Sequence, residues 1–196
     1  MGYILLKQIK LPLVILSFLL VLAANRECLG QSNPDSTAKG ISLVVGIGPD
    51  YAHKQTFFAE LAMARYEFGN WYIGARYLYG NQSVLGVDPD ETINDFGILA
   101  GYYIRKKYYY LSAGAGLSFT NFVNRGKFID SAYSVLVGDI APIYESLHSH
   151  SLCVPLQIEV FWTPSDIIGI GVILFDNINS TENNYGFFIS LKATLY

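Results

Sequence analysis

The sequence has few cysteines, few charged residues and no excess of basic ones. Of the 196 residues two are cysteines and 15% are charged, with 13 Lys and Arg against 16 Asp and Glu. Because a polyanion is bound by a basic surface, this balance excludes a nucleic-acid-binding protein. At 52% apolar residues the chain is too hydrophobic to be disordered, and its length favours a single domain.

The sequence also lacks an apolar run long enough for a membrane-spanning helix. The longest run, 11–24, has about 14 residues, whereas a spanning helix needs roughly 20. Lys7 and Lys10 precede this run and polar residues follow it, which is typical of a secretory signal peptide. We expect residues 1–30 to be a cleaved signal peptide and residues 31–39 to be an N-terminal periplasmic segment.

Cysteine usage follows from this leader. Cys28 would be removed with it, which leaves Cys153 as the one cysteine of the exported protein. An internal disulfide is then excluded. The fold must be stabilised by a packed core or by a membrane.

Alternation with a period of two is the main pattern of the remaining chain. Between residues 109 and 119 the odd positions are all apolar, and the even positions after Tyr110 are Ser or Gly. Only a β-strand places alternate side chains on one face, so this segment is predicted to be a strand with one apolar face.

The same alternation recurs along the chain. The eight segments that show it are 41–48, 57–64, 71–80, 96–104, 109–119, 152–162, 168–174 and 187–195. In the segment 57–64 we expect Phe57 and Leu61 on the apolar outer face and Glu60 on the opposite face. The chain is therefore predicted to be all-β.

The links between these segments alternate in length. Those after the second, fourth and sixth have about three or four residues, and those after the third, fifth and seventh have about 15, 30 and 10. Short turns at one end and long loops at the other are typical of an antiparallel up-and-down transmembrane β-barrel. We predict an eight-stranded outer-membrane barrel over residues 40–196, with turns in the periplasm and loops outside. Apolar pieces in the link 120–150 either lengthen two strands or add a hairpin, which would give ten strands.

Aromatic residues lie at both ends of the predicted apolar faces. Those at the turn ends are Trp71, Tyr109 and Trp162, and those at the loop ends are Phe57, Tyr79, Phe96, Phe119 and Phe187. Because the two interfaces of a bilayer favour such side chains, we interpret them as two membrane-interface girdles.

With these patterns the chain resembles the small outer-membrane β-barrels of the OmpA and OmpX type, whose strands read like residues 109–116, Tyr-Tyr-Leu-Ser-Ala-Gly-Ala-Gly. The resemblance spans nearly all of residues 40–196 and rests on patterns rather than on fixed residues. It implies export through the signal peptide to the outer membrane of a Gram-negative-type bacterium, where the barrel-insertion machinery would place the chain. The expected surroundings are outer-membrane lipids and lipopolysaccharide.

The resemblance also implies a role. A small barrel of this type is expected to be a monomer, without a cofactor or a nucleic-acid partner, that acts structurally or through its extracellular loops. The family has many roles, so that the resemblance identifies no surface partner.

A second resemblance gives an alternative. Residues 68–72, Phe-Gly-Asn-Trp-Tyr, look like the Gly-x-Trp motif of the lipocalins, which are secreted eight-stranded barrels that carry apolar ligands. In that family the motif opens the first strand, whereas here two predicted strands precede it. A carrier of this type also needs an apolar lumen, so we interpret Gly69 and Asn70 as a turn.

Charged residues on the polar faces of the predicted strands suggest what fills the barrel. An eight-stranded barrel is just wide enough inside for side chains, and charges buried there need partners. We expect two acids and two bases to form one interior salt-bridge layer, and the alternative is a path for protons or ions. The four residues are Glu60, Arg76, Glu159 and Lys192.

The segment 148–151, His-Ser-His-Ser, carries acid–base candidates at the outer end of a strand. Barrel enzymes that trim lipid A place a His, a Ser and an acid at this level, which suggests His148 as base, Ser149 as nucleophile and Glu145 as the orienting acid. A lipid A deacylase-like enzyme is therefore the alternative function, although the deacylase pattern has Ser two residues after His. His148, His150 and His53 are a second alternative, as metal ligands. We expect a solvated loop and no enzyme.

Acidic residues cluster in the link before the fourth segment, at Asp88, Asp90, Glu91 and Asp95. They either form a solvated loop, which we expect, or bind the divalent cations that bridge lipopolysaccharide.

Overall fold

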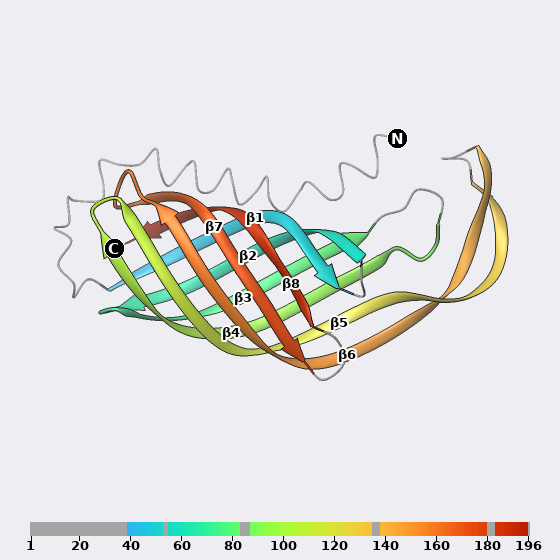
Figure 1. Ribbon diagram of the computed structural model, residues 1–196, viewed down its shortest axis with the longest axis horizontal. Helices are drawn as coiled ribbons and strands as arrows, with labels where there is room; N and C mark the ends of the chain where they lie inside the picture. Colours follow the sequence, from blue (N-terminus) through green and yellow to red (C-terminus); the bar gives the residue numbers. More distant parts are fainter. Residues whose placement is uncertain (1–38, 53–54, 83–86, 135–137, 180–182, 196) are drawn as a thin grey trace.

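The computed structural model describes residues 39–52, 55–82, 87–134, 138–179 and 183–195, and these residues form eight strands (Figure 1). The strands are β1 (Gly40–Ala52), β2 (Gln55–Phe68), β3 (Trp71–Gln82), β4 (Glu91–Lys106), β5 (Tyr109–Ser134), β6 (Asp139–Trp162), β7 (Ile168–Asn179) and β8 (Asn184–Leu195). The predicted signal peptide lies outside the described residues, as does nearly all of the segment 31–39. Within the described ranges no helix is long and apolar enough to cross a membrane.

The strands form one closed barrel. Each pairs antiparallel with the next strand in the sequence, and β1 pairs with β8 to complete the ring. The links after β2, β4 and β6 are short and lie at one end, which we call the turn end, and the opposite end is the loop end. The predicted eight-stranded up-and-down fold is confirmed.

The hairpin of β5 and β6 extends far beyond the rest of the barrel, as Figure 1 shows at the loop end. β5 has 26 residues and β6 has 24, against 12 for β3 and β7. The pairing of β5 with β4 ends at Val123, but its pairing with β6 continues to Ser134. The apolar pieces of this link therefore lengthen two strands, and the described residues contain no additional hairpin.

The two faces of the strands differ as the sequence pattern predicts. In β5 the side chains of Leu111, Leu117 and Phe119 are exposed on the outer face, whereas those of Ser112 and Ser118 are buried inside. Because alternate residues of a strand face opposite ways, this part of β5 directs small and polar residues into the narrow interior and large apolar ones to the outside.

The face predicted for β2 was wrong. Phe57 and Leu61 are buried inside the barrel, whereas Phe58 is 61% exposed and Glu60 lies in register between Ile47 and Tyr79, on the outer face. Phe57 is thus no part of an outer girdle, and Glu60 is no part of an interior layer. The physical reason is that all odd-numbered residues of β2 share one face. Arg65 and Glu67, near the turn end of the strand, are buried inside the barrel, and Phe57 and Leu61 therefore face inwards with them.

Glycines inside the barrel make room for aromatic rings. A Cβ added at Gly114 would overlap the hydroxyl of Tyr72, and one at Gly101 would overlap the ring of the same tyrosine. At the turn between β2 and β3, Gly69 has a φ of 58°, which a glycine adopts at little cost. The hydroxyl of Tyr103 donates to the carbonyl of Gly69 at 2.6 Å, which ties this turn to β4.

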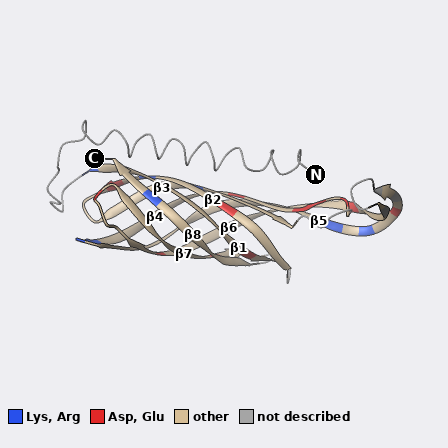
Figure 2. Ribbon diagram, turned by 90° about the horizontal axis from the view of Figure 1, so that it is seen from above, with Lys and Arg blue, Asp and Glu red and all other residues tan. Residues whose placement is uncertain are grey.

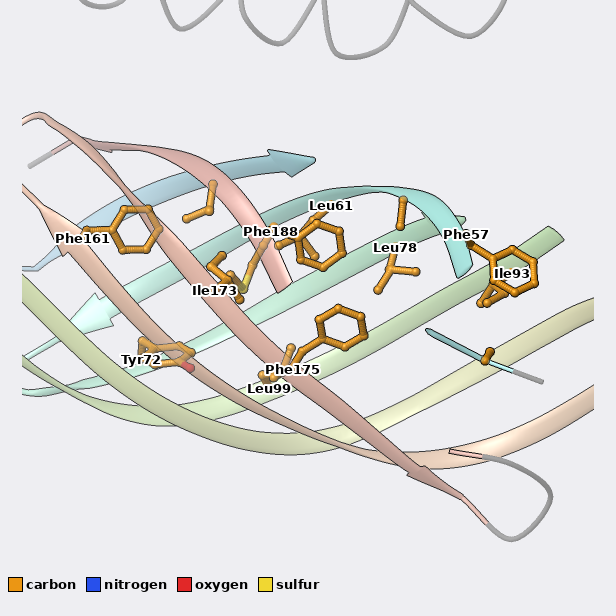
Figure 3. Packing of buried hydrophobic residues seen from close by; sticks show 14 of the residues in the cluster. Phe57, Leu61, Tyr72, Leu78, Ile93, Leu99, Phe161, Ile173, Phe175 and Phe188 are labelled. Atoms are coloured by element: carbon orange, nitrogen blue, oxygen red, sulfur yellow. The ribbon is translucent and has the colours of Figure 1, made fainter. Parts of the chain in front are cut away.

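Apolar side chains pack along the interior of the barrel, as Figure 3 shows. Phe161 and Tyr72 lie towards the turn end, and Phe57 and Ile93 lie towards the loop end. The apolar side chains between them include Leu61, Leu99, Ile173, Phe175 and Phe188. Apolar side chains thus form a packed cluster inside the barrel, between its two ends.

Candidate functional site

Charged side chains in the interior gather around Glu67 near the turn end. The carboxylate of Glu67 accepts hydrogen bonds from Nζ of Lys192 at 2.7 Å and from Nη2 of Arg105 at 2.8 Å. It also accepts a hydrogen bond from the hydroxyl of Ser42 at 2.8 Å. The hydroxyl of Tyr110 of β5 donates to the same carboxylate at 3.3 Å, so four other strands place donors on Glu67.

A third ion pair belongs to the same group. Nη2 of Arg65 donates to Oε2 of Glu159 at 2.8 Å, and Nη1 donates to the hydroxyl of Tyr110 at 3.2 Å. The ring of Tyr110 lies 3.1 Å from Nζ of Lys192, measured to the ring centroid. We call this group the turn-end cluster, and its charged members are Arg65, Glu67, Arg105, Glu159 and Lys192.

A separate polar group lies around Arg76, whose guanidinium also contacts the ring of Phe175. Nη2 of Arg76 donates to Asp95 at 2.7 Å and to Asn177 at 2.6 Å. Asp95 also accepts a hydrogen bond from the hydroxyl of Thr120 at 2.6 Å. We call this group the central cluster. Nearer the loop end, the amide of Asn184 donates to both carboxylate oxygens of Asp50, at 3.3 and 3.0 Å.

The charges of these groups balance. Four carboxylates stand against four cations, and among these eight side chains Arg105 is the most exposed, at 21%. Ionised groups inside a barrel are costly unless each has partners of opposite charge. The eight side chains together carry no net formal charge, and each has a hydrogen-bond partner.

The structure places the four residues predicted for one interior layer at different positions. Arg76, Glu159 and Lys192 are buried inside, but Arg76 lies in the central cluster and the other two lie in the turn-end cluster. They therefore form no single layer, and Glu159 and Lys192 bind different partners. Glu60 lies on the outer face.

Sequence reasoning missed five of the eight charged side chains in these groups. The missed residues are Asp50, Arg65, Glu67, Asp95 and Arg105. The parity of β2 was the signal that could have found two of them. Arg65 and Glu67 are two residues apart in one strand, so their side chains share one face. Two charged side chains are expected to face the lumen, where partners are available, rather than an apolar outer face.

The acidic residues predicted for the link before β4 do not all lie in a solvated loop, because Glu91 and Asp95 belong to β4 itself. Asp95 is buried against Arg76, and Glu91 pairs with Arg125 of β5 at 3.6 Å. Asp95 and Glu91 therefore belong to ion pairs within the protein.

The aromatic residues predicted for the two girdles, apart from Phe57, lie on the outer face. Tyr79 is half-buried there, beside Glu60. Phe58 stands where Phe57 was expected. The exposed residues are Trp71, Phe96, Tyr109, Phe119, Trp162 and Phe187, with exposed fractions between 41% and 62%.

The predicted catalytic residues of β6 do not assemble. His148 and Ser149 are neighbours on one strand, so their side chains point to opposite faces. Nε2 of His148 instead lies 3.2 Å from the hydroxyl of Ser146, and the ring of His150 stacks on Phe119. Glu145 is exposed, on the same face of the strand as Ser149. A nucleophile must be within hydrogen-bond reach of its base, and this arrangement lacks that contact.

A metal site is not supported either. His53 lies outside the described residues. Among the residues that the structure does describe, no group of three or more His, Cys, Asp or Glu side chains is placed to hold a metal ion. Cys153 is buried, with its sulfur 3.0 Å from the hydroxyl of Thr120.

Comparison with known proteins adds information at the level of the fold. No protein-family model matches the sequence, and no curated protein matches it either. Solved structures do match. Neisserial surface protein A is 10% identical, with a TM-score of 0.56 over 79% of this chain and 96% of its own. The chain has the fold of a small outer-membrane β-barrel.

Two further structures give the same result. The attachment invasion locus protein Ail of Yersinia pestis, solved with the heparin analogue sucrose octasulfate, is 11% identical with a TM-score of 0.54, over 80% of this chain and 97% of its own. The N-terminal barrel domain of OprF from Pseudomonas aeruginosa is 10% identical with a TM-score of 0.51, over 79% of this chain and 97% of its own. The resemblance to barrels of the OmpA and OmpX type is thus confirmed for the fold.

Proposed function

We propose that this chain is an integral outer-membrane protein with a plugged interior, which acts structurally or through its extracellular loop end. The observation that carries the proposal is the reversed polarity of the barrel. Large apolar side chains are exposed on the outer face of every strand, and ion pairs occupy the interior. A closed barrel satisfies its backbone hydrogen bonds internally and can expose such a face only to lipid.

The interior argues against a lipocalin-like carrier. Such a carrier needs an apolar lumen, whereas this barrel buries carboxylates such as Glu67, Glu159 and Asp95. The charged side chains in the lumen therefore favour a structural role over the binding of an apolar ligand inside the barrel. The unassembled His148 and Ser149 favour a protein without enzyme activity.

The hairpin of β5 and β6 is the element best suited to meet a surface partner. Phe128, Ile129, Tyr133 and Ile140 are between 59% and 69% exposed on it. Figure 2 shows charged residues of both signs on the same projecting part. Exposed apolar side chains interspersed with charges are typical of an interaction surface.

Membrane insertion can be tested with the full-length chain expressed in a Gram-negative host. We expect the protein in the outer-membrane fraction, and a shift in gel mobility between heated and unheated samples. Recovery as a detergent-free monomer in the periplasmic fraction would overturn the proposal.

Orientation can be tested with single cysteines in a Cys153→Ala background. A membrane-impermeant maleimide applied to intact cells should label Tyr133→Cys on the hairpin and spare Pro164→Cys in the turn between β6 and β7. After cell lysis both should react. The opposite pattern in intact cells would show that the hairpin faces the periplasm.

A further inference from the structure

An apolar groove crosses the outer face of the barrel over β1 to β4. Its volume is about 390 Å³, and its surface is almost entirely apolar. A cavity of roughly 150 Å³ is enough for one benzene molecule, so this groove has room for an alkyl chain. The outer-face residues that line it include Leu43, Val45, Ala62, Ala64, Ala75 and Tyr77.

The register of the strands explains the hollow. One row of paired outer-face residues runs Val45, Ala62, Tyr77 and Phe96, and the next runs Leu43, Ala64, Ala75 and Ile98. Three alanines thus form the floor, because their side chains reach least far from the sheet. Larger residues of β1 form one wall, and Tyr77 with Phe96 forms the other.

A carboxylate stands at the loop-end side of this floor. Glu60 is the outer-face residue of β2 next to Ala62 on the side of the loop end, and it is in register with Tyr79. Beside it the hydroxyl of Tyr77 donates to the side-chain oxygen of Asn94 at 3.1 Å. The outer face therefore carries an apolar groove with an acidic and hydroxyl-bearing rim at one end.

We propose that the groove binds one acyl chain of a membrane lipid whose headgroup carries an ammonium group, which pairs with the Glu60 carboxylate. The inference rests on the proposed function, because only a membrane-inserted barrel meets lipid at this face. Charge complementarity selects the headgroup, since a carboxylate at the edge of a bilayer is stabilised by a cation within hydrogen-bond reach. Shape selects the chain, because a recessed floor between walls fits a slender alkyl chain better than the convex side of a second barrel.

Native mass spectrometry of the full-length chain, released from nanodiscs, tests the proposal. The nanodiscs contain equal parts of phosphatidylethanolamine and phosphatidylglycerol. We expect one retained phosphatidylethanolamine molecule per barrel. Ala64→Phe fills the floor and should lower retention about tenfold. Ala115→Phe, on the outer face of β5, is the matched control and should leave retention unchanged.

A headgroup variant separates the two parts of the site. Glu60→Gln should abolish the preference for phosphatidylethanolamine over phosphatidylglycerol while a bound chain is still retained. Equal retention by Ala64→Phe and Ala115→Phe would overturn the proposal, as would a barrel dimer that Ala64→Phe converts to a monomer.

Failure of this inference can be distinguished from failure of the proposed function. The heat-dependent gel shift is measured on each nanodisc sample. A barrel that shows the shift but retains no lipid contradicts the groove alone, whereas a chain that does not enter the nanodisc contradicts the membrane assignment as well.

Discussion

Glu67 of β2 and Lys192 of β8 form an ion pair at 2.7 Å across the interior side of β1, the strand that lies between them in the barrel wall. β1 and β8 are the first and last strands, and their pairing closes the ring. The ion pair therefore ties together the two sides of the closure. Arg105, on the same carboxylate, extends this connection to β4.

Removal of the Glu67 charge should destabilise the barrel. Glu67→Gln leaves Lys192 and Arg105 without their carboxylate in a buried site, so we expect a loss of about 3 kcal/mol in the free energy of unfolding. Urea unfolding in lipid vesicles measures it. The double variant Glu67→Gln with Lys192→Met should be more stable than the single variant, because it removes one uncompensated charge. Equal stability of the two would contradict the pairing.

Substitution of Glu60 should have the opposite effect. On an outer face that meets lipid, an acidic side chain costs up to about 1 kcal/mol. In vesicles of phosphatidylglycerol, which offer no ammonium partner, Glu60→Leu should therefore raise the free energy of unfolding by about this amount. Glu159→Leu serves as the interior counterpart and should lower it, because Arg65 loses its partner. A destabilising Glu60→Leu would argue for an interior position.

The close approach of Tyr72 to β5 predicts an asymmetry between neighbouring positions. Gly114→Val places methyl groups where the Tyr72 hydroxyl lies, so we expect a loss of about 2 kcal/mol from overpacking. Ala113→Val projects outwards and should change the stability by less than about 0.5 kcal/mol. Equilibrium unfolding of both variants, with circular dichroism of the strands, checks the difference.

The projecting hairpin should be dispensable for the barrel. Arg125 and Ser146 face each other across β5 and β6, so residues 126–145 can be replaced by an Asn-Gly turn that suits a two-residue connection. We expect the shortened protein to keep its heat-dependent gel shift and its unfolding midpoint, because β4 and β7 pair with β5 and β6 below this point. Loss of the gel shift would show that the hairpin is part of the folding unit.

Much of the fold can be predicted from the pattern of residues along the chain. The alternation of apolar with small or polar residues predicts each strand, because every second side chain of an extended chain points to the same face. Link lengths predict the up-and-down order, and neither prediction requires knowledge of which strands meet across the ring. The site is less predictable, since the partners of an ion pair or hydrogen bond come from strands far apart in the sequence: Arg65 and Glu159 are on β2 and β6, and Arg76 and Asn177 are on β3 and β7.

The sequence by itself determined the eight strands, their antiparallel order and the apolar face of every strand in which large and small residues alternate. Only the tertiary structure decided the face of β2, where Phe57 and Phe58 are equally apolar and the choice depends on burial of the charges at the other end of the strand. It also decided which charges meet and where the outer face is hollow. These features depend on the register between neighbouring strands and on side chains that cross the lumen, and a pattern within one strand contains neither.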